Sequence, residues 1–564
     1  MVEPKNKLPL RWAGLGGLEE VGRNCMFFEY KNEIIVVDLG LQFPDEETPG
    51  VDYILPNVSY LEEKKEDIRA LVITHGHYDH IGAIPYLMDK IGNPPIYCGR
   101  LTKEIILKRQ EEFDSKSELK FVIVQDKQKI KLSKYFQIEF FEVIHSIPDT
   151  FGFILNTPIG KLVHFAEFKL PHRKKYLESD LKNSLKKYQH VFNQDIHTLF
   201  LESTNAEVEG YSVPEEEVVK NLDEIFKKSP GRIIVATFAS LISRIDTILK
   251  LAIKHHRKVS ISGRTMEDNV KIAQRLGYLK IPEELIIPKS LVNRYPDNKL
   301  VLLVTGAQGE PTANLMRIAN SEHRWIKIKP KQDTVVFSSS IIPGNERNIE
   351  YLKDKLAKQK VKIYCVKVLD IHSGGHAPRE ELRLIIKNTK PRFFVPIHGS
   401  YYMRALNRQI GIECDIPESN IFLPANGEVL NLFPESIKFT METIPSSYSI
   451  VDGLTVEKMK DIVLRDRKLL AQGGIVVIVS TIKRGTTNLV KNPDVISRGF
   501  IYLRANKELV DEIKQRVRQI LKRLPTYKPL DLDYFKTLVR QQIENFLYKK
   551  TRKRPMVVAT VVEV

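Results

Sequence analysis

Short apolar runs separated by polar turns fill the first 170 residues, and this pattern predicts β-strands. The predicted strands cover residues 33–38, 70–74, 120–124, 137–143 and 161–165. Apolar residues at helical spacing predict helices between some of these strands, over 81–90 and 103–114. Because strands and helices are mixed, we expect stacked α/β layers.

A regular alternation of strand and helix begins near residue 206. Strands are predicted at 232–237, 258–262, 301–305 and 334–338, and helices at 242–255 and 266–276. This order is typical of a largely parallel sheet with helices on both faces. Such sheets bind ligands at the carboxyl ends of their strands. The loops predicted at that edge are 237–240, 263–265, 305–311 and 338–344.

The rest of the chain returns to α/β signals in two blocks. Strands are predicted at 362–368 and 392–397, and a turn-rich stretch follows at 445–453. The last block contains predicted strands at 474–480 and 556–562 and helices at 507–524 and 530–548. The pattern therefore predicts several α/β domains.

Length and composition narrow the class of protein. At about 100 to 200 residues per domain, the 564 residues correspond to three to five domains. Four cysteines without a C-x-x-C pair are too few for a disulfide framework, which favours the reducing cytoplasm. No apolar run reaches the ~18 residues of a membrane span, and residues 1–12 lack the apolar region of a signal peptide. We expect a soluble, cytoplasmic protein without a membrane partner.

The chain is strongly basic. It has 87 Lys and Arg against 70 Asp and Glu, a net charge of +17 at pH 7. Such an excess favours a polyanionic partner such as nucleic acid, because neutralising phosphates releases counterions. A Lys-rich composition explains it equally well, because we expect the charge to be spread along the chain, with one local concentration at 549–554.

The most informative segment follows the predicted strand 70–74. It reads His75-Gly76-His77-Tyr78-Asp79-His80. Three histidines and a carboxylate this close together do not serve core packing, because each costs several kcal/mol when buried without a partner. They are ligands that Zn²⁺ or Mn²⁺ prefers. On a turn, His75 and His77 can bind one ion while Asp79 and His80 bind another, which suits two-metal hydrolysis.

A two-metal site needs more ligands than one loop supplies. Candidates that follow predicted strands are His145, Glu167 and His398. A second histidine pair, His372 and His376, encloses Ser373, Gly374 and Gly375. Glycines let backbone N–H groups approach an anion closely, so the loop 372–376 predicts a phosphate-binding site.

Several further segments match one family in order along the chain. The matching segments are His75–His80, His145–Asp149, Gly231–Ser240, Thr305–Pro311, Phe337–Gly344, His372–His376, Pro396–Gly399 and Phe546–Val564. Together they closely resemble bacterial ribonuclease J over essentially the whole chain. The resemblance implies an α/β fold: a metallo-β-lactamase αββα sandwich with an inserted β-CASP α/β domain and a small C-terminal α/β domain.

The resemblance also implies domain boundaries. The metallo-β-lactamase domain would comprise residues 1–205 and 361–445, with the β-CASP domain, 206–360, inserted between its two parts. A linker, 446–460, would lead to a C-terminal self-association domain, 461–564.

The implied activity is that of a metal-dependent ribonuclease with 5′-to-3′ exonuclease and endonuclease activity. It would act in messenger RNA decay and ribosomal RNA 5′-end maturation, by attack of a metal-activated water on phosphodiesters. The implied partners are single-stranded RNA held by its 5′ end, further copies of the chain in a homodimer or homotetramer, a paralogous ribonuclease J subunit, and ribosomes or RNA-decay proteins.

The family's motif assigns roles to the candidate residues. Two Zn²⁺ ions, or Mn²⁺ or Mg²⁺, would share Glu167 as a bridging ligand. The other implied ligands are His75, His77 and His145 for one ion and Asp79, His80 and His398 for the other. The implied catalytic residues are His376 and Asp79, and the implied substrate-binding residues are His372, Ser373, Gly374, Gly375 and His376. A structural Ca²⁺ would bind at Gly50, Asp52 and Asp452.

Two departures from the family's pattern keep other hypotheses open. The family has Gly-Asp-Phe-Lys where this chain has Ala166-Glu167-Phe168-Lys169, so the bridging carboxylate is one methylene longer. Gly374 stands where the family usually has Ser, which leaves the preference for a 5′-monophosphate open. A second hypothesis is therefore a weakly active or non-catalytic RNA-binding paralogue that is the partner subunit of an active ribonuclease J. A third is a hydrolase of a small acyl or phosphate ester, because the metal loop alone does not define the substrate.

Overall fold

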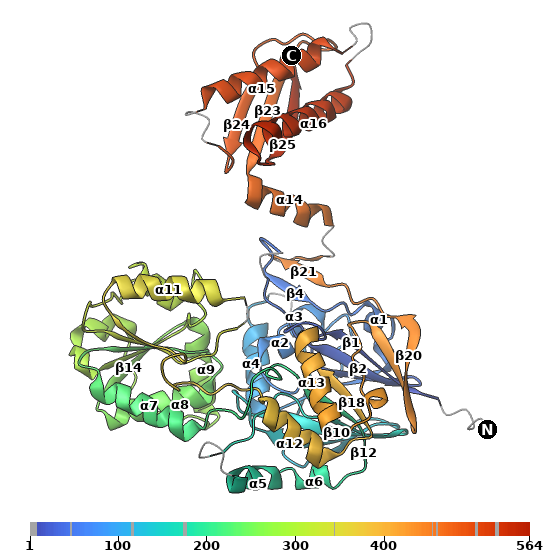
Figure 1. Ribbon diagram of the computed structural model, residues 1–564, viewed down its shortest axis with the longest axis vertical. Helices are drawn as coiled ribbons and strands as arrows, with labels where there is room; N and C mark the ends of the chain where they lie inside the picture. Colours follow the sequence, from blue (N-terminus) through green and yellow to red (C-terminus); the bar gives the residue numbers. More distant parts are fainter. Residues whose placement is uncertain are drawn as a thin grey trace. The chain divides into compact units, whose positions relative to one another are not determined.

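The computed structural model describes residues 8–44, 48–113, 118–172, 178–342, 344–453, 455–457, 461–501, 506–524 and 530–564. The chain separates into two compact units, one of residues 1–42 and 55–448 and one of residues 43–54 and 449–564 (Figure 1). Of the predicted linker, residues 454 and 458–460 lie outside the described residues. Within the described ranges, no helix has both the length and the apolar character needed to cross a membrane.

Two facing β-sheets form the centre of the first unit. The eight-stranded sheet has the order β20-β19-β1-β2-β3-β5-β6-β7, at Ser436–Thr443, Glu428–Phe433, Leu10–Gly16, Cys25–Tyr30, Glu33–Val37, Ile68–Val72, Ile96–Cys98 and Phe121–Ile123. The six-stranded sheet has the order β18-β12-β11-β10-β9-β8, at Phe393–Ile397, Ile196–Glu202, Gly160–His164, Thr150–Thr157, Gln137–Val143 and Lys129–Lys131.

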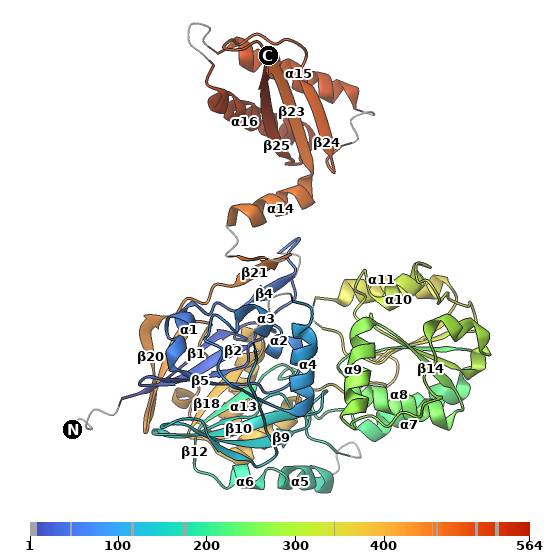
Figure 2. The ribbon, with the colours of Figure 1, turned by 180° about the vertical axis from the view of Figure 1, so that it is seen from behind.

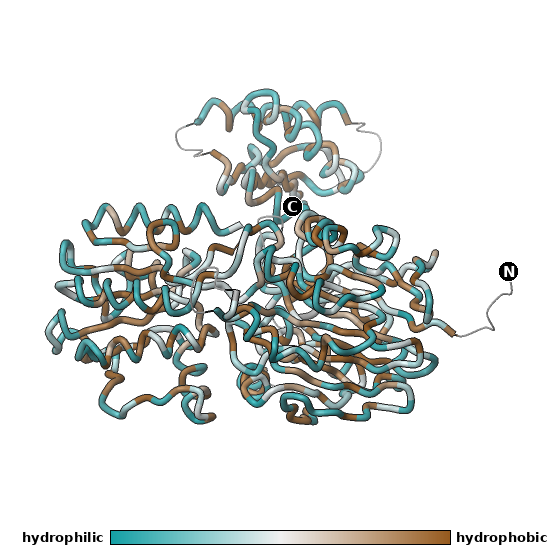
Figure 3. The backbone as a smooth tube through the Cα atoms, turned by 60° about the horizontal axis from the view of Figure 1, so that its bottom comes forward, coloured by the Kyte–Doolittle hydropathy of each residue, from teal (hydrophilic) through white to brown (hydrophobic). Residues whose placement is uncertain are grey.

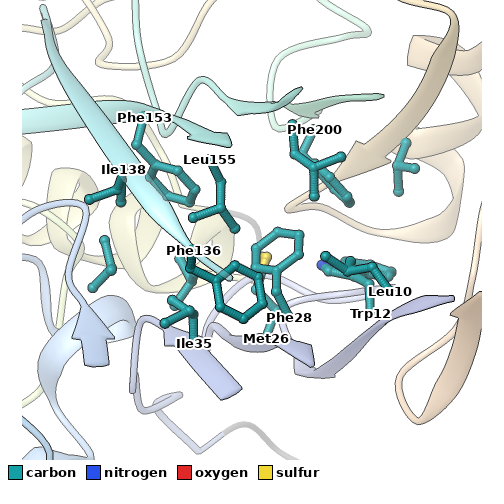
Figure 4. Packing of buried hydrophobic residues seen from close by; sticks show 14 of the residues in the cluster. Leu10, Trp12, Met26, Phe28, Ile35, Phe136, Ile138, Phe153, Leu155 and Phe200 are labelled. Carbon is teal, nitrogen blue, oxygen red and sulfur yellow. The ribbon is translucent and has the colours of Figure 1, made fainter. Parts of the chain in front are cut away.

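Aromatic side chains fill the space between these sheets. Trp12 and Phe28, from the eight-stranded sheet, pack against Phe200 of β12 with ring centroids 5.2 Å and 5.4 Å apart (Figure 4). Because successive strand residues face opposite sides, Phe27 points away from this core. It stacks at 5.2 Å on Tyr60 of helix α1, Ser59–Glu63.

Helices cover the outer faces and complete an αββα arrangement. Four helices pack on the outer face of the six-stranded sheet: α5, Glu178–Lys186; α6, Gln189–Phe192; α12, Arg379–Thr389; and α13, Tyr401–Glu413. The predicted stack of α/β layers is confirmed. Short 3₁₀ helices lie at Lys65–Asp67, Lys289–Arg294, Asp297–Lys299 and Glu418–Asn420.

The helix predicted at 81–90 is wrong in extent. Two short helices replace it, α2 at Tyr78–Ile81 and α3 at Ile84–Leu87. Pro85 lies in the first turn of α3, where its missing N–H is tolerated, but it cannot donate to the carbonyl of Ile81 and so cannot continue α2. The helix predicted at 103–114 is α4, Arg100–Gln110, and residue 114 lies outside the described residues.

The inserted region contains the predicted parallel sheet. Its order is β14-β15-β13-β16-β17, at Lys258–Ser262, Leu300–Val304, Ile233–Ala236, Thr334–Phe337 and Lys362–Tyr364, and every neighbouring pair is parallel. Helices α10, Asn314–Ala319, and α11, Glu346–Lys358, pack on one face. Helices α7, Glu215–Lys228, and α8, Ile242–Lys254, lie on the other (Figures 1 and 2). Strand β17 belongs to this sheet because its backbone pairs with β16. The sheet therefore extends beyond the boundary predicted at 360.

Helix α9, Arg264–Arg275, connects the inserted region to the sandwich. It lies beside α4 in both ribbon views (Figures 1 and 2). An ion pair joins Arg264 to Glu112 at 3.4 Å, and Arg275 forms another with Glu104. The hydroxyl of Tyr278 donates to Asp149 at 2.6 Å, so polar contacts as well as packing hold the two parts together.

The second unit has two small sheets. Strands β24, Asp494–Arg498, β23, Ile475–Ile482, and β25, Met556–Glu563, form one sheet. Helices α15, Lys507–Lys522, and α16, Leu532–Thr551, pack on one of its faces. The other sheet consists of β22, Thr455–Glu457, β21, Ser449–Asp452, and β4, Tyr53–Leu55, and helix α14, Asp461–Gly473, follows it. The stretch predicted as turn-rich therefore contains a strand.

Hydropathy follows the predicted pattern in both units. Hydrophobic stretches run along the strands, and hydrophilic stretches lie mainly on the outer turns of the helices (Figure 3). Burial of the apolar faces is the main driving force for this arrangement.

Candidate metal centre

His75 and His77, in the loop after β5, and His145, after β9, meet Glu167 at the edge of the sandwich. His77 Nδ1 lies 3.0 Å from His75 Nε2 and 3.2 Å from His145 Nε2. Glu167 Oε2 lies 3.4 Å from His75 Nε2 and 3.2 Å from His145 Nε2. Ligands of a tetrahedral ion with bonds of about 2.1 Å stand about 3.4 Å apart. These four atoms therefore have the spacing of one ligand set.

A second group shares the same glutamate. Glu167 Oε1 lies 2.8 Å from Nε2 of His80 and 2.8 Å from Nε2 of His398. Asp79 Oδ2 lies 3.4 Å and 3.7 Å from the same two nitrogens. Nε2 of His398 is buried. Although this nitrogen lies close to Glu167, it forms no hydrogen bond with any described residue. The longer carboxylate thus presents one oxygen to each group.

The outer ring nitrogens are fixed by the surrounding protein. Nδ1 of His80 lies 2.8 Å from Asp38, that of His145 lies 2.8 Å from the carbonyl of Gly375, and that of His398 lies 2.7 Å from the hydroxyl of Thr204. Each imidazole therefore keeps Nε2 for the inside of the centre. Such outer partners are typical of metal-ligating histidines.

Burial and charge set the protonation of the two groups differently. Burial, reinforced by neighbouring histidines, lowers the pKa of His75 to about 4 and that of His77 to about 3. Both are neutral at pH 7, the form that binds metal. Burial opposes protonation of His398 as well, but the carboxylates of Glu167 and Asp79 outweigh it and raise its pKa to about 10. A cation at the second group would replace that proton.

Backbone conformation at three strand ends supports a functional site. Asp38, Ala166 and His398 have φ of 59°, 53° and 50°, a left-handed region that non-glycine residues rarely adopt. Such strained residues cluster at active sites, where the surrounding structure holds them. The imidazole and carboxylate donors of the two groups are ligands that Zn²⁺ or Mn²⁺ prefers, and their spacing could hold a metal ion.

The structure adds a residue that the sequence analysis missed. Glu202, the last residue of β12, accepts a hydrogen bond from Nδ1 of His376 at 2.5 Å. His376 and Glu202 also group with His398, with their ligand atoms within 4.8 Å of one another. Glu202 and Asp38 share a signal that could have found them: each is an acidic residue at the end of an otherwise apolar run.

The loop 372–376 divides into two parts. Gly375 lies against His145, where an added Cβ would come within 2.6 Å of the ring, whereas Gly374 has only the Asn205 amide nearby, at 3.9 Å. Ser373 is buried and accepts a hydrogen bond from Lys169 at 3.0 Å. His372 is buried and belongs to neither metal group. The structure thus places His376, but not His372, beside the metal centre.

The predicted Ca²⁺ site is lined by an arginine. Arg467 donates to the carbonyl of Gly50 at 2.8 Å and also contacts the carboxylate of Asp452. Asp52 accepts a hydrogen bond from the backbone N–H of Gly453 at 2.8 Å. Because the Arg467 guanidinium already occupies the oxygens of Gly50 and Asp452, the arrangement does not fit a dication bound to those two residues.

Four family models match successive parts of the chain. They are the metallo-beta-lactamase superfamily over 18–165, the ribonuclease J beta-CASP domain over 230–356, a Zn-dependent metallo-hydrolase RNA specificity domain over 360–417, and the ribonuclease J C-terminal domain over 462–564.

Relatives match the chain over most of its length. Ribonuclease J2 of Bacillus subtilis is 32% identical over 563 residues, covering 100% of both chains. Ribonuclease J of a Synechocystis species is 36% identical over 512 residues, 91% of this chain and 79% of that protein. Among solved structures, a protein of unknown function from Enterococcus faecalis matches with a TM-score of 0.52 and 16% identity, over 75% of this chain and 100% of that one. This last likeness concerns the fold alone.

Proposed function

The chain belongs to the ribonuclease J family and is a metal-dependent nuclease; from that membership we propose that it degrades single-stranded RNA as a 5′-to-3′ exonuclease and also cleaves internally. The single observation that carries the proposal is the position of Glu167. Its two oxygens lie between two groups of histidines, with Oε1 at 2.8 Å from one group and Oε2 at 3.2 Å from the other. This arrangement supports two ions in one active centre.

We assign His75, His77 and His145 to one ion and Asp79, His80 and His398 to the other, with Glu167 shared. The ions, when bound, supply an activated water and positive charge against the scissile phosphate. The chain's own residues fix their geometry, because each outer ring nitrogen is hydrogen-bonded by the sandwich.

His376 is proposed to act on the substrate. Glu202 binds its Nδ1 and is itself held by the backbone N–H of Phe168 at 2.8 Å, so the imidazole is oriented from behind. Nε2 is then the ring nitrogen left for substrate, where it can hold a proton for the leaving oxygen or stabilise the developing charge. Asp79 completes the proposed catalytic pair as a ligand of the second ion.

The inserted region is proposed to contribute to the RNA-binding site. Ser338, at the carboxyl end of β16, donates to the carbonyl of Ile371 at 2.7 Å, next to the loop 372–376. Lys169 joins Ser373 to Glu215 of α7 with contacts of 3.0 Å and 2.8 Å. The strand-end loops of the inserted sheet thus lie against the proposed phosphate-binding loop.

We propose the cellular role and organisation from the family. The enzyme would act in the cytoplasm in messenger RNA decay and ribosomal RNA 5′-end maturation, with ribosomes or RNA-decay proteins as partners. Residues 1–205 and 361–445 would be the catalytic domain, except that β17 pairs with the sheet of the inserted β-CASP domain, 206–360. Residues 461–564 would be the domain that forms dimers or tetramers, alone or with a paralogous subunit.

A second candidate, the weakly active partner subunit, is motivated by Glu167 and Gly374. Against it, Glu167 reaches both groups, and an added Cβ at Gly374 would meet only the Asn205 amide, at 3.9 Å, among the described residues, so the missing side chain disturbs no neighbour. Metal analysis separates the two. An RNA-binding protein with less than one zinc or manganese per chain would favour the partner subunit.

The direct test is cleavage of 5′-monophosphorylated and 5′-triphosphorylated RNA with Mn²⁺, with Mg²⁺ and with chelator. We expect cleavage with metal only, and loss of cleavage with retained RNA binding in His77→Ala. His256→Ala is the matched control, because this histidine is exposed on the inserted region. Turnover by purified His77→Ala equal to that of the unchanged protein would contradict the proposal.

A further inference from the structure

The positive charge of the chain is concentrated in its last part rather than spread evenly, which corrects the expectation from the whole sequence. Residues 461–564 contain 22 Lys and Arg against 10 Asp and Glu, a net +12 of the total +17. The other 460 residues carry the remaining +5. A polyanion would therefore be attracted mainly to the C-terminal domain.

Six of these cations form one surface, here called the basic patch, where the end of α16 meets α15. Its members, all exposed, are Arg516, Lys549, Lys550, Arg552, Lys553 and Arg554. Lys550 pairs with Glu512 of α15 at 2.8 Å. The guanidinium of Arg516, one turn further along α15, lies 4.1 Å from the ring centre of Phe546 on α16. These contacts place the two helices' cations together.

Aromatic rings order the arginines of the basic patch. Arg554 lies 4.3 Å and Arg552 6.0 Å from the ring centre of Tyr548. Stacking on a ring fixes the plane of a guanidinium while leaving its N–H groups available to an anion. A phosphate group thus meets partly preorganised donors.

Few carboxylates neutralise the basic patch. Among the described residues, Lys550 is its one member in an ion pair, and Arg554 interacts electrostatically with Glu544. Cations near the end of α16 also favour its helix dipole, but that interaction contributes about 0.3 to 1 kcal/mol and fades within one turn. It does not account for six cations, of which one lies on α15 and three follow the end of α16.

We propose that the basic patch binds the sugar–phosphate backbone of single-stranded RNA at a site separate from the metal centre. The inference rests on the proposed function only in taking RNA as the polyanion. Lys and Arg contacts to phosphates position a strand without reading its sequence. A long RNA bound at both sites is held more tightly than a short one, because the second contact is intramolecular.

The test measures RNA binding by the full-length, metal-loaded protein across a salt series. Phosphorothioate RNAs of about 6 and about 40 nucleotides are the probes, and fluorescence anisotropy gives the affinity. The test variant combines Lys549→Gln, Lys553→Gln and Arg554→Gln. The matched control combines Lys220→Gln, Lys228→Gln and Lys250→Gln, which remove the same charge from exposed positions of the inserted region.

For single strands, each phosphate contact contributes about 0.7 to the salt slope, so three lost contacts lower the slope by about 2 and the affinity at 0.15 M salt roughly 50-fold. We expect this loss for the long RNA in the test variant, with the short RNA unaffected and the control within about twofold of the unchanged protein. Equal affinities of test and control variants for the long RNA would overturn the proposal. A lighter species in sedimentation would also overturn it, by assigning the basic patch to contacts between copies of the chain.

Cleavage of an unmodified short RNA with Mn²⁺ separates this proposal from the proposed function. If the unchanged protein cleaves no RNA, the proposed nuclease fails whatever the basic patch does. If the unchanged protein and the test variant cleave short RNA equally well, the binding measurements alone show whether the basic patch binds RNA.

Discussion

Shortening Glu167 to Asp tests whether the two metal groups depend on the reach of this side chain. In the structure, Oε1 lies 2.8 Å from Nε2 of both His80 and His398, and Oε2 lies 3.2 Å from His145. Removing one methylene withdraws the carboxylate by about 1.5 Å if the backbone stays in place. The 2.8 Å separation then becomes about 4.3 Å, whereas an ion with bonds of about 2.1 Å joins donors at most about 4.2 Å apart.

We therefore expect Glu167→Asp to weaken metal binding by about 10- to 100-fold and cleavage by about 100-fold. The assays are competition of zinc-loaded protein with a chelator, metal content by mass spectrometry, and turnover of a short RNA. Glu435→Asp, the same change at an exposed position, is the control and should behave as the unchanged protein.

Full metal content and full turnover in Glu167→Asp would refute this reasoning, because the strand end would then adapt to either length. A gain of turnover over a weak starting activity would refute it in a more informative way. It would show that Glu167 impairs the centre and would favour the partner-subunit hypothesis.

Three further outcomes follow from the structure. Gly375→Ala should lower zinc affinity at least tenfold in chelator competition, because the added Cβ would lie 2.6 Å from the His145 ring. Gly374→Ala is the control and should bind zinc normally, because its Cβ would lie 3.9 Å from its nearest neighbour. Asp38→Asn should also lower zinc affinity by about 10- to 100-fold, because the carboxylate orients a ligand imidazole at 2.8 Å, and unchanged affinity would argue against that role. Burial lowers the pKa of His372 from 6.5 to about 3, so its stabilising contribution is present above pH 6.5 and is lost as the pH falls towards 3. Between pH 7 and pH 5 the contribution of His372 should lower the free energy of unfolding by about 2 kcal/mol. Urea unfolding at the two pH values measures this fall, and in His372→Gln the fall should be smaller by about that amount.

Local features of the chain were predictable because neighbouring residues create them. The loop His75–His80 places four metal-ligand side chains within six residues. The apolar runs at 137–143 and 258–262 coincide with strands β9 and β14. The break after Ile81 was also readable in principle, since Pro85 cannot donate the hydrogen bond that a continuous helix requires.

Partners distant in sequence were not predictable in the same way. Glu202 lies 174 residues from His376, yet their side chains are 2.5 Å apart because β12 ends beside the loop 372–376. Asp38, which follows β3, and His80, on helix α2, likewise come within 2.8 Å of each other. An acidic residue at the end of an apolar strand is a signal for such roles, but it does not identify the partner.

The sequence by itself determined the kind of chemistry, the layered α/β architecture and the family, because residue types, periodicity and a dense donor loop are local properties of the chain. Only the tertiary structure decided which carboxylate oxygen faces which histidine, that His372 lies away from the metal groups while His376 lies beside them, and that cations from α15 and α16 share one surface. The physical reason is that these relations depend on where strands and helices end in space. Packing of both sheet faces sets those positions, and residues far apart in the chain contribute to it together.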